Sequence, residues 1–177
     1  MQPDQEVIKR WSGSAPFWEK HRDIIGQMFA PITQALVEDG QIGTQHTVMD
    51  VATGPGEPAL SVAALVGHEG KIFGIDPIPE MIAGARRAAS RLGLKNVQFD
   101  VASADRLPFP ADTFDAAISR FGVMLFPRPN RRGSRDVESA QARTETGFGG
   151  RMSIRHDLRR MRWMHFASPV LANYERF

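Results

Sequence analysis

The sequence contains no cysteine among its 177 residues. Disulfide bridges and cysteine-ligated metal sites are therefore excluded, and we expect no metal site. The sequence also has no apolar run as long as the ~18 residues that a membrane span requires. Its first residues, Met1 to Glu6, are polar and acidic, unlike a secretory signal. We therefore expect a soluble, cytoplasmic protein whose length suits one domain with a proper core.

Lysine is absent from the last part of the chain, where arginine supplies every cation. The net charge of +2 conceals this asymmetry, because residues 1–127 hold 11 Lys+Arg and 15 Asp+Glu, whereas residues 128–177 hold 11 arginines and 5 acids. A basic end of this kind is one signature of a nucleic-acid-binding tail. A second explanation is that this part of the gene is read in a shifted frame, whose codons happen to encode arginine.

A glycine turn between a predicted strand and a predicted helix is the centre of the sequence. Residues 46–52 are apolar enough for a strand that is covered on both faces. Gly54 and Gly56 follow, and they allow a tight turn at which the backbone approaches a ligand without an intervening Cβ. The helix expected from Glu57 onward directs its free N–H groups at this turn.

Asp50, at the end of the strand, helps to identify the ligand. The glycines, together with Ala59, also fit the Gly-x-Gly-x-x-Ala pattern of dinucleotide sites. The dianionic pyrophosphate of a dinucleotide gains nothing from a neighbouring carboxylate, whereas a ligand that carries an ammonium and a sulfonium does. An ordinary strand-to-helix turn without a ligand is the remaining alternative.

Strands alternate with helices after the glycine turn. The expected elements are a helix through Val66, a strand at 71–76, a helix at 79–92, and strands at 96–101 and 114–119. This order predicts an α/β fold with a doubly wound, Rossmann-like, mostly parallel sheet. Ligands of such sheets bind beyond the carboxyl ends of the strands. Six candidate residues lie at or just past those ends: Asp50, Gly54, Gly56, Asp76, Ser103 and Ser119.

The N-terminal region reads as helical. Residues 23–40 have apolar side chains at helical spacing, which predicts one helix covering the sheet. Residues 1–24 are helical in part and carry three large aromatic side chains among charged ones, at Trp11, Phe17 and Trp18. These aromatic side chains either pack against the domain or form a lid over a ligand cleft. We divide the chain into a helical cap (1–40), a core (41–127) and an atypical tail (128–177).

Asp76, at the end of the second strand, lies 20 residues after Gly56. A carboxylate at this place accepts hydrogen bonds from both hydroxyls of an adenosine ribose. The alternative is a helix cap, because aspartate is a favoured capping residue. Pro77 and Pro79 stiffen the segment that follows. Ile78 or Met81 could pack on an adenine ring, although Met81 also fits the core.

Four motifs at family spacing together resemble the class I S-adenosylmethionine-dependent methyltransferases, especially the ubiquinone- and menaquinone-type branch. They cover roughly residues 40–127 and comprise Val48 to Gly56, Gly74 to Ile82, Ala102 to Pro110, and Asp112 to Met124. The resemblance implies strands in the spatial order 3-2-1-4. It also implies S-adenosylmethionine as cofactor and a small-molecule methyl acceptor.

The resemblance implies a role for each matching residue. The methionine end of the cofactor would be held by Asp50 and the backbone of Ala52, Thr53, Gly54, Pro55 and Gly56. The adenosine end would meet Asp76 at the ribose and, near the adenine, Pro77, Ile78, Met81, Ser103 and Ala104. Ser119 and Arg120 would line the cleft near the methionine moiety and the acceptor. No general base is identifiable.

Two positions depart from the family pattern. The family often has glycine at the position of Ala52, where one methyl group is a small change. It usually has aspartate at the position of Ser103, where a serine hydroxyl accepts a hydrogen bond from the adenine without charge assistance. We therefore expect weaker adenine recognition.

The chain departs from the family altogether after Pro127. The family continues with a helix, a Lys-Pro-Gly-Gly turn and a fifth apolar strand, none of which is visible here. Reading Asp136 to Thr144 one base later, with permitted codons, gives Met-Trp-Arg-Ala-Leu-Lys-Pro-Gly. We therefore propose a frameshift near residue 130. It predicts that the fourth strand forms a bare edge, that residues 130–150 are poorly ordered and that nucleic acid is not a partner.

The sequence thus favours a methyltransferase acting on a small molecule. Two alternatives remain at this stage: a cofactor-binding fragment that is inactive or needs a partner, and an NAD(P)-dependent oxidoreductase. The sequence indicates neither the acceptor, nor the methylated atom, nor the oligomeric state.

Overall fold

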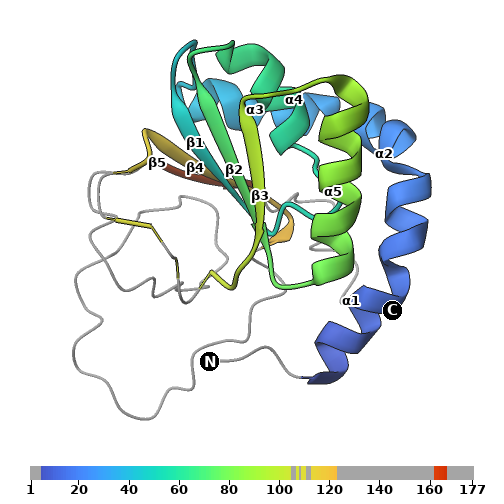
Figure 1. Ribbon diagram of the computed structural model, residues 1–177. Helices are drawn as coiled ribbons and strands as arrows, with labels where there is room; N and C mark the ends of the chain where they lie inside the picture. The colour runs from blue at the N-terminus through green and yellow to red at the C-terminus, as the bar shows by residue number, and fades with distance from the viewer. Residues whose placement is uncertain (1–4, 105–106, 108, 111–112, 123–161, 167–177) are drawn as a thin grey trace, which may run out of the picture.

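The computed structural model describes residues 5–104, 107, 109–110, 113–122 and 162–166. In chain order the elements are α1 (Gln5–Lys20), α2 (Arg22–Met28), α3 (Ala30–Asp39), β1 (Thr47–Val51), α4 (Ala59–Val66), β2 (Lys71–Asp76), α5 (Pro79–Leu92), β3 (Val97–Val101), β4 (Ala116–Arg120) and β5 (Arg162–Phe166) (Figure 1). In this described part, no helix combines the length and apolar character that a membrane crossing demands.

The strands form one parallel sheet in the order β3-β2-β1-β4-β5. The α/β class and the order 3-2-1-4 predicted from the sequence are confirmed. The register places Asp50 of β1 beside Gly74 of β2 on one side and beside Ile118 of β4 on the other. All strands therefore end at the same edge of the sheet, which is where ligands of parallel sheets bind.

The fifth strand corrects one expectation, because β4 does not form a bare edge. Residues Arg162 to Phe166 pair with β4 in parallel along all five positions. A parallel neighbour needs a long crossover connection rather than a hairpin. The arginines of the tail obscure this strand in the sequence, whereas Trp163 and Phe166 are residue types that suit a strand. The expectations for residues 128–161 and 167–177 lie outside the described residues.

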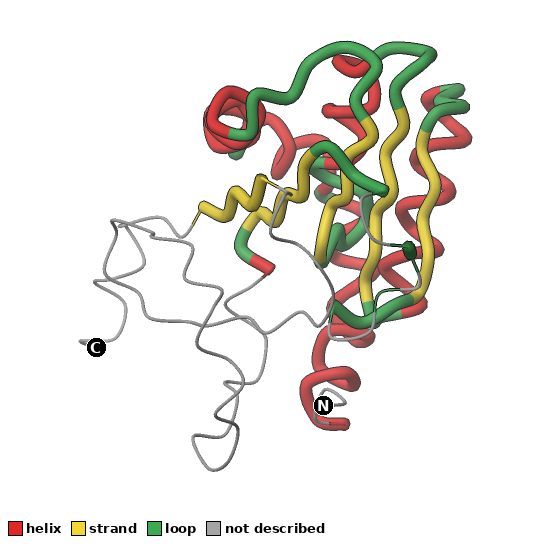
Figure 2. The backbone as a smooth tube through the Cα atoms, turned by 90° about the vertical axis from the view of Figure 1, so that its left-hand side faces the viewer, coloured by secondary structure: helices red, strands yellow, loops and turns green. Residues whose placement is uncertain are grey.

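The two faces of the sheet are covered differently. The larger core cluster joins one face of the strands to α3, α4 and α5, with Leu36, Val48, Val62, Ile72 and Ile82 among its buried members. Figure 2 shows helices, in red, packed alongside the yellow strands. The smaller cluster, on the other face, contains Met49, Val51, Ile75, Ala104, Phe114 and Ala117. Three mutually edge-on rings, Phe73, Phe109 and Phe114, close this second face.

The single helix predicted at 23–40 is divided into α2 and α3 at Phe29. Pro31 explains the division, because a continuous helix would need an N–H group from it and would force its ring against the preceding turn. Consequently the apolar face predicted for residues 23–40 is only partly buried. Ile24 and Met28 are 65% and 63% exposed, whereas Leu36 is buried.

Helix α1 lies along the outer side of α5 (Figure 1). Glu19 of α1 accepts hydrogen bonds from Arg87 of α5 at 2.8 and 2.6 Å. The Ser12 hydroxyl bonds to Glu80 at the start of α5 and lowers the pKa of that carboxyl group. These contacts fix α1 beside the segment that follows β2.

Candidate cofactor site

The glycine turn lies at the carboxyl end of β1 and is open where a ligand would approach. Gly54 has a φ of +56°, and a Cβ added to it would meet no atom within 4 Å. Gly56 has a φ of +112°, and a Cβ there would lie 2.8 Å from Leu60 and 3.3 Å from Ala85. Gly54 thus provides bare backbone at the surface of the turn, while Gly56 lets the turn pack tightly on α4 and α5.

Asp50 is fully buried at the end of β1, beneath this turn. Its Oδ2 atom accepts a hydrogen bond from the Ala59 N–H at 3.2 Å, which satisfies one of the free donors at the start of α4. Its Oδ1 atom is buried and has no hydrogen-bond partner, and the same is true of the Thr53 hydroxyl oxygen. Burial raises the pKa of Asp50 to about 7. The Thr53 hydroxyl lies close enough to the carboxyl group to lower this pKa in part, as the Arg120 charge also does, but the hydroxyl does not meet the geometry of a hydrogen bond.

Asp76 occupies the equivalent place at the end of β2, and both of its oxygens are engaged. Oδ2 accepts the Gly54 N–H at 3.0 Å, and Oδ1 accepts the Ile78 N–H at 2.9 Å. Burial raises the pKa of Asp76 to about 6, against the opposing effect of these two N–H groups. Each oxygen keeps one lone pair, so Asp76 can support the turn and also accept hydrogen bonds from a diol.

Ala52 has a φ of +58°, the left-handed conformation that explains why glycine suits this position. Its methyl group is accommodated by a glycine elsewhere, because a Cβ on Gly122 would lie only 2.3 Å from the Ala52 Cβ. The two small residues are therefore coupled, although they are far apart in the sequence.

Ser119 and Arg120, at the end of β4, bind protein groups in this structure. The fully buried Ser119 hydroxyl donates to the Val51 carbonyl at 2.8 Å, which ties β4 to β1. The Arg120 guanidinium donates to the Thr33 hydroxyl at 3.0 Å and to the Glu57 carbonyl at 3.3 Å. It also lies over the Phe29 ring, 5.5 Å from its centroid. Burial lowers the pKa of Arg120, while Asp50 and Glu57 raise it.

The segment after Asp76 is covered by α1. Ile78 and Met81 are 4% and 3% exposed, and they form a cluster with Ala15 that Ile8, Trp11 and Trp18 complete. Pro77, between Asp76 and this cluster, is half-buried. Of the two interpretations for the N-terminal aromatic residues, packing therefore describes Trp11 and Trp18, whereas Phe17 is 61% exposed.

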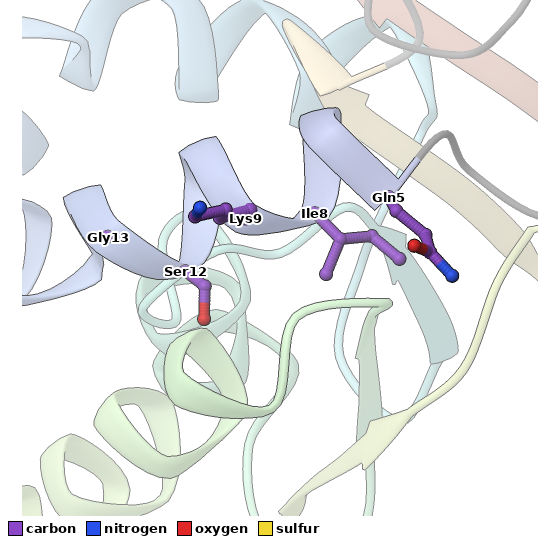
Figure 3. Close-up of a pocket in the computed structure, with 5 residues that line it drawn as sticks. All are labelled: Gln5, Ile8, Lys9, Ser12 and Gly13. Carbon is purple, nitrogen blue, oxygen red and sulfur yellow. The ribbon is translucent and has the colours of Figure 1, made fainter.

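The remaining adenine candidates follow β3. Ser103 is half-buried, and Ala104 is 4% exposed within the core cluster of the second face. An open hollow of about 500 Å³ lies along the first half of α1, lined by Gln5, Ile8, Lys9, Ser12 and Gly13. In Figure 3, Ile8 and Ser12 point from α1 toward the start of α5. This hollow shares Ile8 with the cluster around Ile78, so it adjoins the adenosine side of the candidate site.

Three residues next to the site were missed by the sequence analysis: Arg22, Thr33 and Glu57. Thr33 and Glu57 hold Arg120, and the Glu57 side chain lies against Gly26 of α2. A signal existed only for Arg22, which lies three residues before Ile25 and seven before Phe29. It is thus a cation on the stripe that carries the apolar side chains of α2 and α3.

Together these residues offer complementary chemistry at adjacent strand ends. Asp50 provides a buried acceptor without a donor, the glycine turn provides exposed backbone, and Asp76 provides a carboxylate above the next strand. An ammonium fits the first group and a ribose diol fits the last. The residues present therefore fit a cofactor that has an amino-acid end and an adenosine end.

Comparisons with known proteins agree with this geometry. A family described as methyltransferase domain matches residues 48–139, which is more than half of the chain. Aklanonic acid methyltransferase DauC of Streptomyces sp. (strain C5) is 34% identical over 101 residues, covering 57% of this chain and 46% of that protein. The uncharacterized methyltransferase YcgJ of Bacillus subtilis is 31% identical over 91 residues, covering 51% of this chain and 35% of that protein. The chain spans less than half the length of these relatives.

Solved structures show the same fold. The [4+2]-cyclase SpnF is 30% identical with a TM-score of 0.50, covering 54% of this chain and 35% of that one. A putative S-adenosylmethionine-dependent methyltransferase of Methanococcus maripaludis has a TM-score of 0.56 at 19% identity, covering 66% and 52%. These findings support neither an NAD(P)-dependent oxidoreductase nor an inactive fragment. The chain belongs to the methyltransferase-domain family, and its cofactor is S-adenosylmethionine.

Proposed function

We propose that this chain transfers a methyl group from S-adenosylmethionine to a small-molecule acceptor. The observation that supports the proposal most directly is the unsatisfied Oδ1 atom of Asp50, buried beneath an open glycine turn. A buried acceptor without a donor is costly in a protein that only has to fold. The ammonium group of an amino acid supplies the missing donor and a compensating charge.

Different residues along the strand ends bind different parts of the cofactor. Asp50 and Thr53 hold the ammonium, and the backbone from Ala52 to Gly56 lies along the methionine chain. Asp76 accepts the ribose hydroxyls, and Pro77, Ser103 and Ala104 border the adenine. Because α1 already covers Ile78 and Met81, these two side chains act as the floor on which the adenine edge rests rather than as an open stacking surface.

Ser119 and Arg120 act in this proposal by positioning. Ser119 fixes the end of β4 against Val51, and Arg120 ties α3 to the residue that follows Gly56. S-adenosylmethionine supplies an electrophilic methyl group on its sulfonium. The protein contributes by orienting this group toward the acceptor and by excluding water.

Two observations favour a small acceptor over a nucleic acid. Residues 1–127, which contain the whole described site, hold 11 Lys+Arg and 15 Asp+Glu, so their charge repels a polyanion. The name of the similar protein DauC also refers to a small molecule, aklanonic acid, as its substrate. A quinone-like or other small molecule is therefore the class of acceptor to test first.

The proposal is tested by binding and then by methyl transfer. Calorimetry with S-adenosylmethionine should show one site, and calorimetry with NAD should show none. Asp50→Asn should weaken the affinity for S-adenosylmethionine at least tenfold, because a charge-assisted hydrogen bond to the ammonium is lost. Asp39→Asn, which changes an exposed acid on α3, is the matched control and should leave the affinity unchanged.

Methyl transfer is then followed with methyl-labelled cofactor and a panel of small aromatic acceptors, with RNA and a denatured protein as further substrates. Label in the small molecules supports the proposal. Label only in RNA or protein would refute the small-molecule acceptor while leaving the cofactor assignment intact. Binding of S-adenosylmethionine without transfer to any acceptor would indicate a binding protein.

A further inference from the structure

Arg22, the first residue of α2, is a buried cation with one hydrogen-bond donor left free. Its side chain is 9% exposed, and its Nη1 atom is buried with no hydrogen-bond partner. Among the described residues its ion pair runs from Nη2 to Asp23 at 3.5 Å, and the Asp23 side chain is 88% exposed. The hydrogen bond from Arg87 lowers the pKa of Glu19, and the Arg22 charge also contributes to this lowering. A buried donor without an acceptor is unfavourable, so an anion that accepts from Nη1 is favoured.

The position of Arg22 follows from its neighbours on the same helical face. Hydrogen bonds from His21 to Phe17 and from Ile25 to His21, both 3.0 Å, continue the helical pattern across the junction of α1 and α2. Residues 19, 22 and 26 therefore share one face. Glu19 contacts Arg87 of α5 and approaches Gly84, while Gly26 lies against the Glu57 side chain. Arg22 thus lies between α5 and the end of the glycine turn.

The two structures on either side of Arg22 touch each other. A Cβ on Gly56 would lie 3.3 Å from the Ala85 Cβ, so the turn and α5 are in contact at this level. Arg22 therefore covers the junction between the glycine turn and α5, on the side of the turn that the N-terminal helices close.

Other cations around the candidate site are already engaged. Arg120 binds Thr33 and the Glu57 carbonyl, Arg87 binds Glu19, and Arg86 binds the Phe99 carbonyl. The Glu57 carboxylate accepts from the Ser61 hydroxyl at 2.7 Å. Among these arginines, Arg22 alone retains a buried donor for a ligand.

We propose that the Arg22 guanidinium binds the α-carboxylate of the cofactor's methionine end. This inference rests on the proposed function, because it assigns the second charge of a zwitterion whose ammonium meets Asp50. The α-carboxylate and the α-ammonium of an amino acid need opposite partners; Asp50 lies beneath the glycine turn, and Arg22 lies where the turn meets α5. The carboxylate accepts the free Nη1–H of Arg22, and the fork geometry of arginine suits this pairing.

The test compares two ligands that differ only in the carboxylate: S-adenosylmethionine and decarboxylated S-adenosylmethionine. Calorimetry is done on the full chain and on Arg22→Met, with Lys20→Met as control, because Lys20 is an exposed cation two residues away. The unaltered chain should bind S-adenosylmethionine about 10- to 100-fold more tightly than the decarboxylated compound. Arg22→Met should remove this difference by weakening S-adenosylmethionine alone, and Lys20→Met should change neither affinity.

Each other outcome overturns the inference in a distinguishable way. Equal weakening of both ligands by Arg22→Met would show that Arg22 only supports the fold, and no weakening would show that it does not reach the cofactor. If the unaltered chain binds both ligands equally, the inference fails even if the variant does not fold, while the proposed cofactor stands. If the chain binds neither, the proposed function fails with it. Thermal unfolding without ligand adds a check, since Arg22→Met removes a buried charge whose one ion pair is to an exposed carboxylate and should not lower the midpoint.

Discussion

Two aspartates at the ends of neighbouring strands differ in how many of their oxygens accept hydrogen bonds from the protein. Asp76, at the end of β2, gives both oxygens to backbone N–H groups of the site. Asp50, at the end of β1, gives one oxygen to Ala59 and leaves the other buried without a donor. Asp76 is therefore part of the scaffold that shapes the turn, and Asp50 is the group that the scaffold holds ready for a ligand.

The two aspartates therefore have different roles, one in holding the turn and one in binding a ligand. Asp76 satisfies the Gly54 N–H, so it holds the glycine turn against β2 and joins the two strand ends. Asp50 is the more deeply buried and has the larger pKa rise, to about 7 against about 6. The fold thus tolerates at Asp50 an unfavourable environment that a bound ammonium would relieve.

The largest expected effect on stability is at Asp76. Asp76→Ala removes the acceptors of two backbone N–H groups and should lower the free energy of unfolding by roughly 2–5 kcal/mol. Asp50→Ala removes one acceptor and should cost roughly 1–3 kcal/mol. Urea denaturation without ligand at pH 5, where the raised pKa values keep both carboxyl groups largely protonated in the folded chain, measures both.

Asp39→Ala, an exposed acid on α3, is the control and should leave the free energy of unfolding within about 0.5 kcal/mol of the original. A larger loss of unfolding free energy in Asp50→Ala than in Asp76→Ala would contradict the assignment of Asp76 as the structural residue. It would mean that the single bond to the start of α4 holds the site more firmly than the two bonds made by Asp76.

The second largest expected effect is a pH dependence of the unfolding free energy, caused by the raised pKa of Asp50. Because its pKa is raised from 3.8 to about 7, the folded chain retains a proton that the unfolded chain releases. The associated stability is fully present below about pH 4 and is lost as the pH rises through about 7. Relative to Asp50→Asn, the unmodified chain should lose roughly 3 kcal/mol of unfolding free energy between pH 5 and pH 8.

The Asp50→Asn reference carries the same Asp76 contribution, so the difference between the two curves isolates Asp50. If unfolding free energy varied with pH in the same way in the unmodified chain and in Asp50→Asn, Asp50 would not be protonated in the folded state. Saturating S-adenosylmethionine should flatten the dependence of the unmodified chain, since a neighbouring ammonium stabilises the ionised carboxylate.

Local patterns in the sequence were sufficient for strands β1 to β4 and for α4 and α5, whereas the sheet order came from the family resemblance and β5 was not predicted. The apolar runs that end in Asp50 and Asp76, separated by a glycine turn and a helical pattern, determine that both acids reach one edge of a parallel sheet. The division at Phe29 was also readable in principle, because Pro31 follows it and cannot continue a helix.

The rest depended on contacts between distant residues, which no local pattern contains. The sequence showed Asp76 as a ribose ligand or a cap, and only the fold revealed that it bonds Gly54 across two strands. Helix α1 covers Ile78 and Met81 because of side chains sixty or more residues away in the chain. The frameshift near residue 130 and the assignment of individual cofactor ligands stay predictions.

The smallest expected effect concerns the end of β1 that faces β4, where Ala52 and Gly122 are coupled. Gly122→Ala would place a Cβ 2.3 Å from the Ala52 Cβ, 2.9 Å from Ser119 Oγ and 3.2 Å from the Val51 carbonyl oxygen. Overpacking of this kind should cost roughly 1–3 kcal/mol. Ala52→Gly alone should be nearly neutral, because relief of the left-handed alanine offsets the greater freedom of the unfolded chain.

Combining the two substitutions should recover part of the loss, because only the contact with the Ala52 methyl group is removed. A coupling energy of roughly 0.5–2 kcal/mol from urea denaturation of the four proteins would confirm the pairing. Gly43→Ala, at a glycine with open space around it and no positive φ, serves as the control. Strict additivity would mean that Ser119 and Val51, rather than Ala52, require glycine at 122. The methyl group at 52 would then be tolerated for a reason local to the turn.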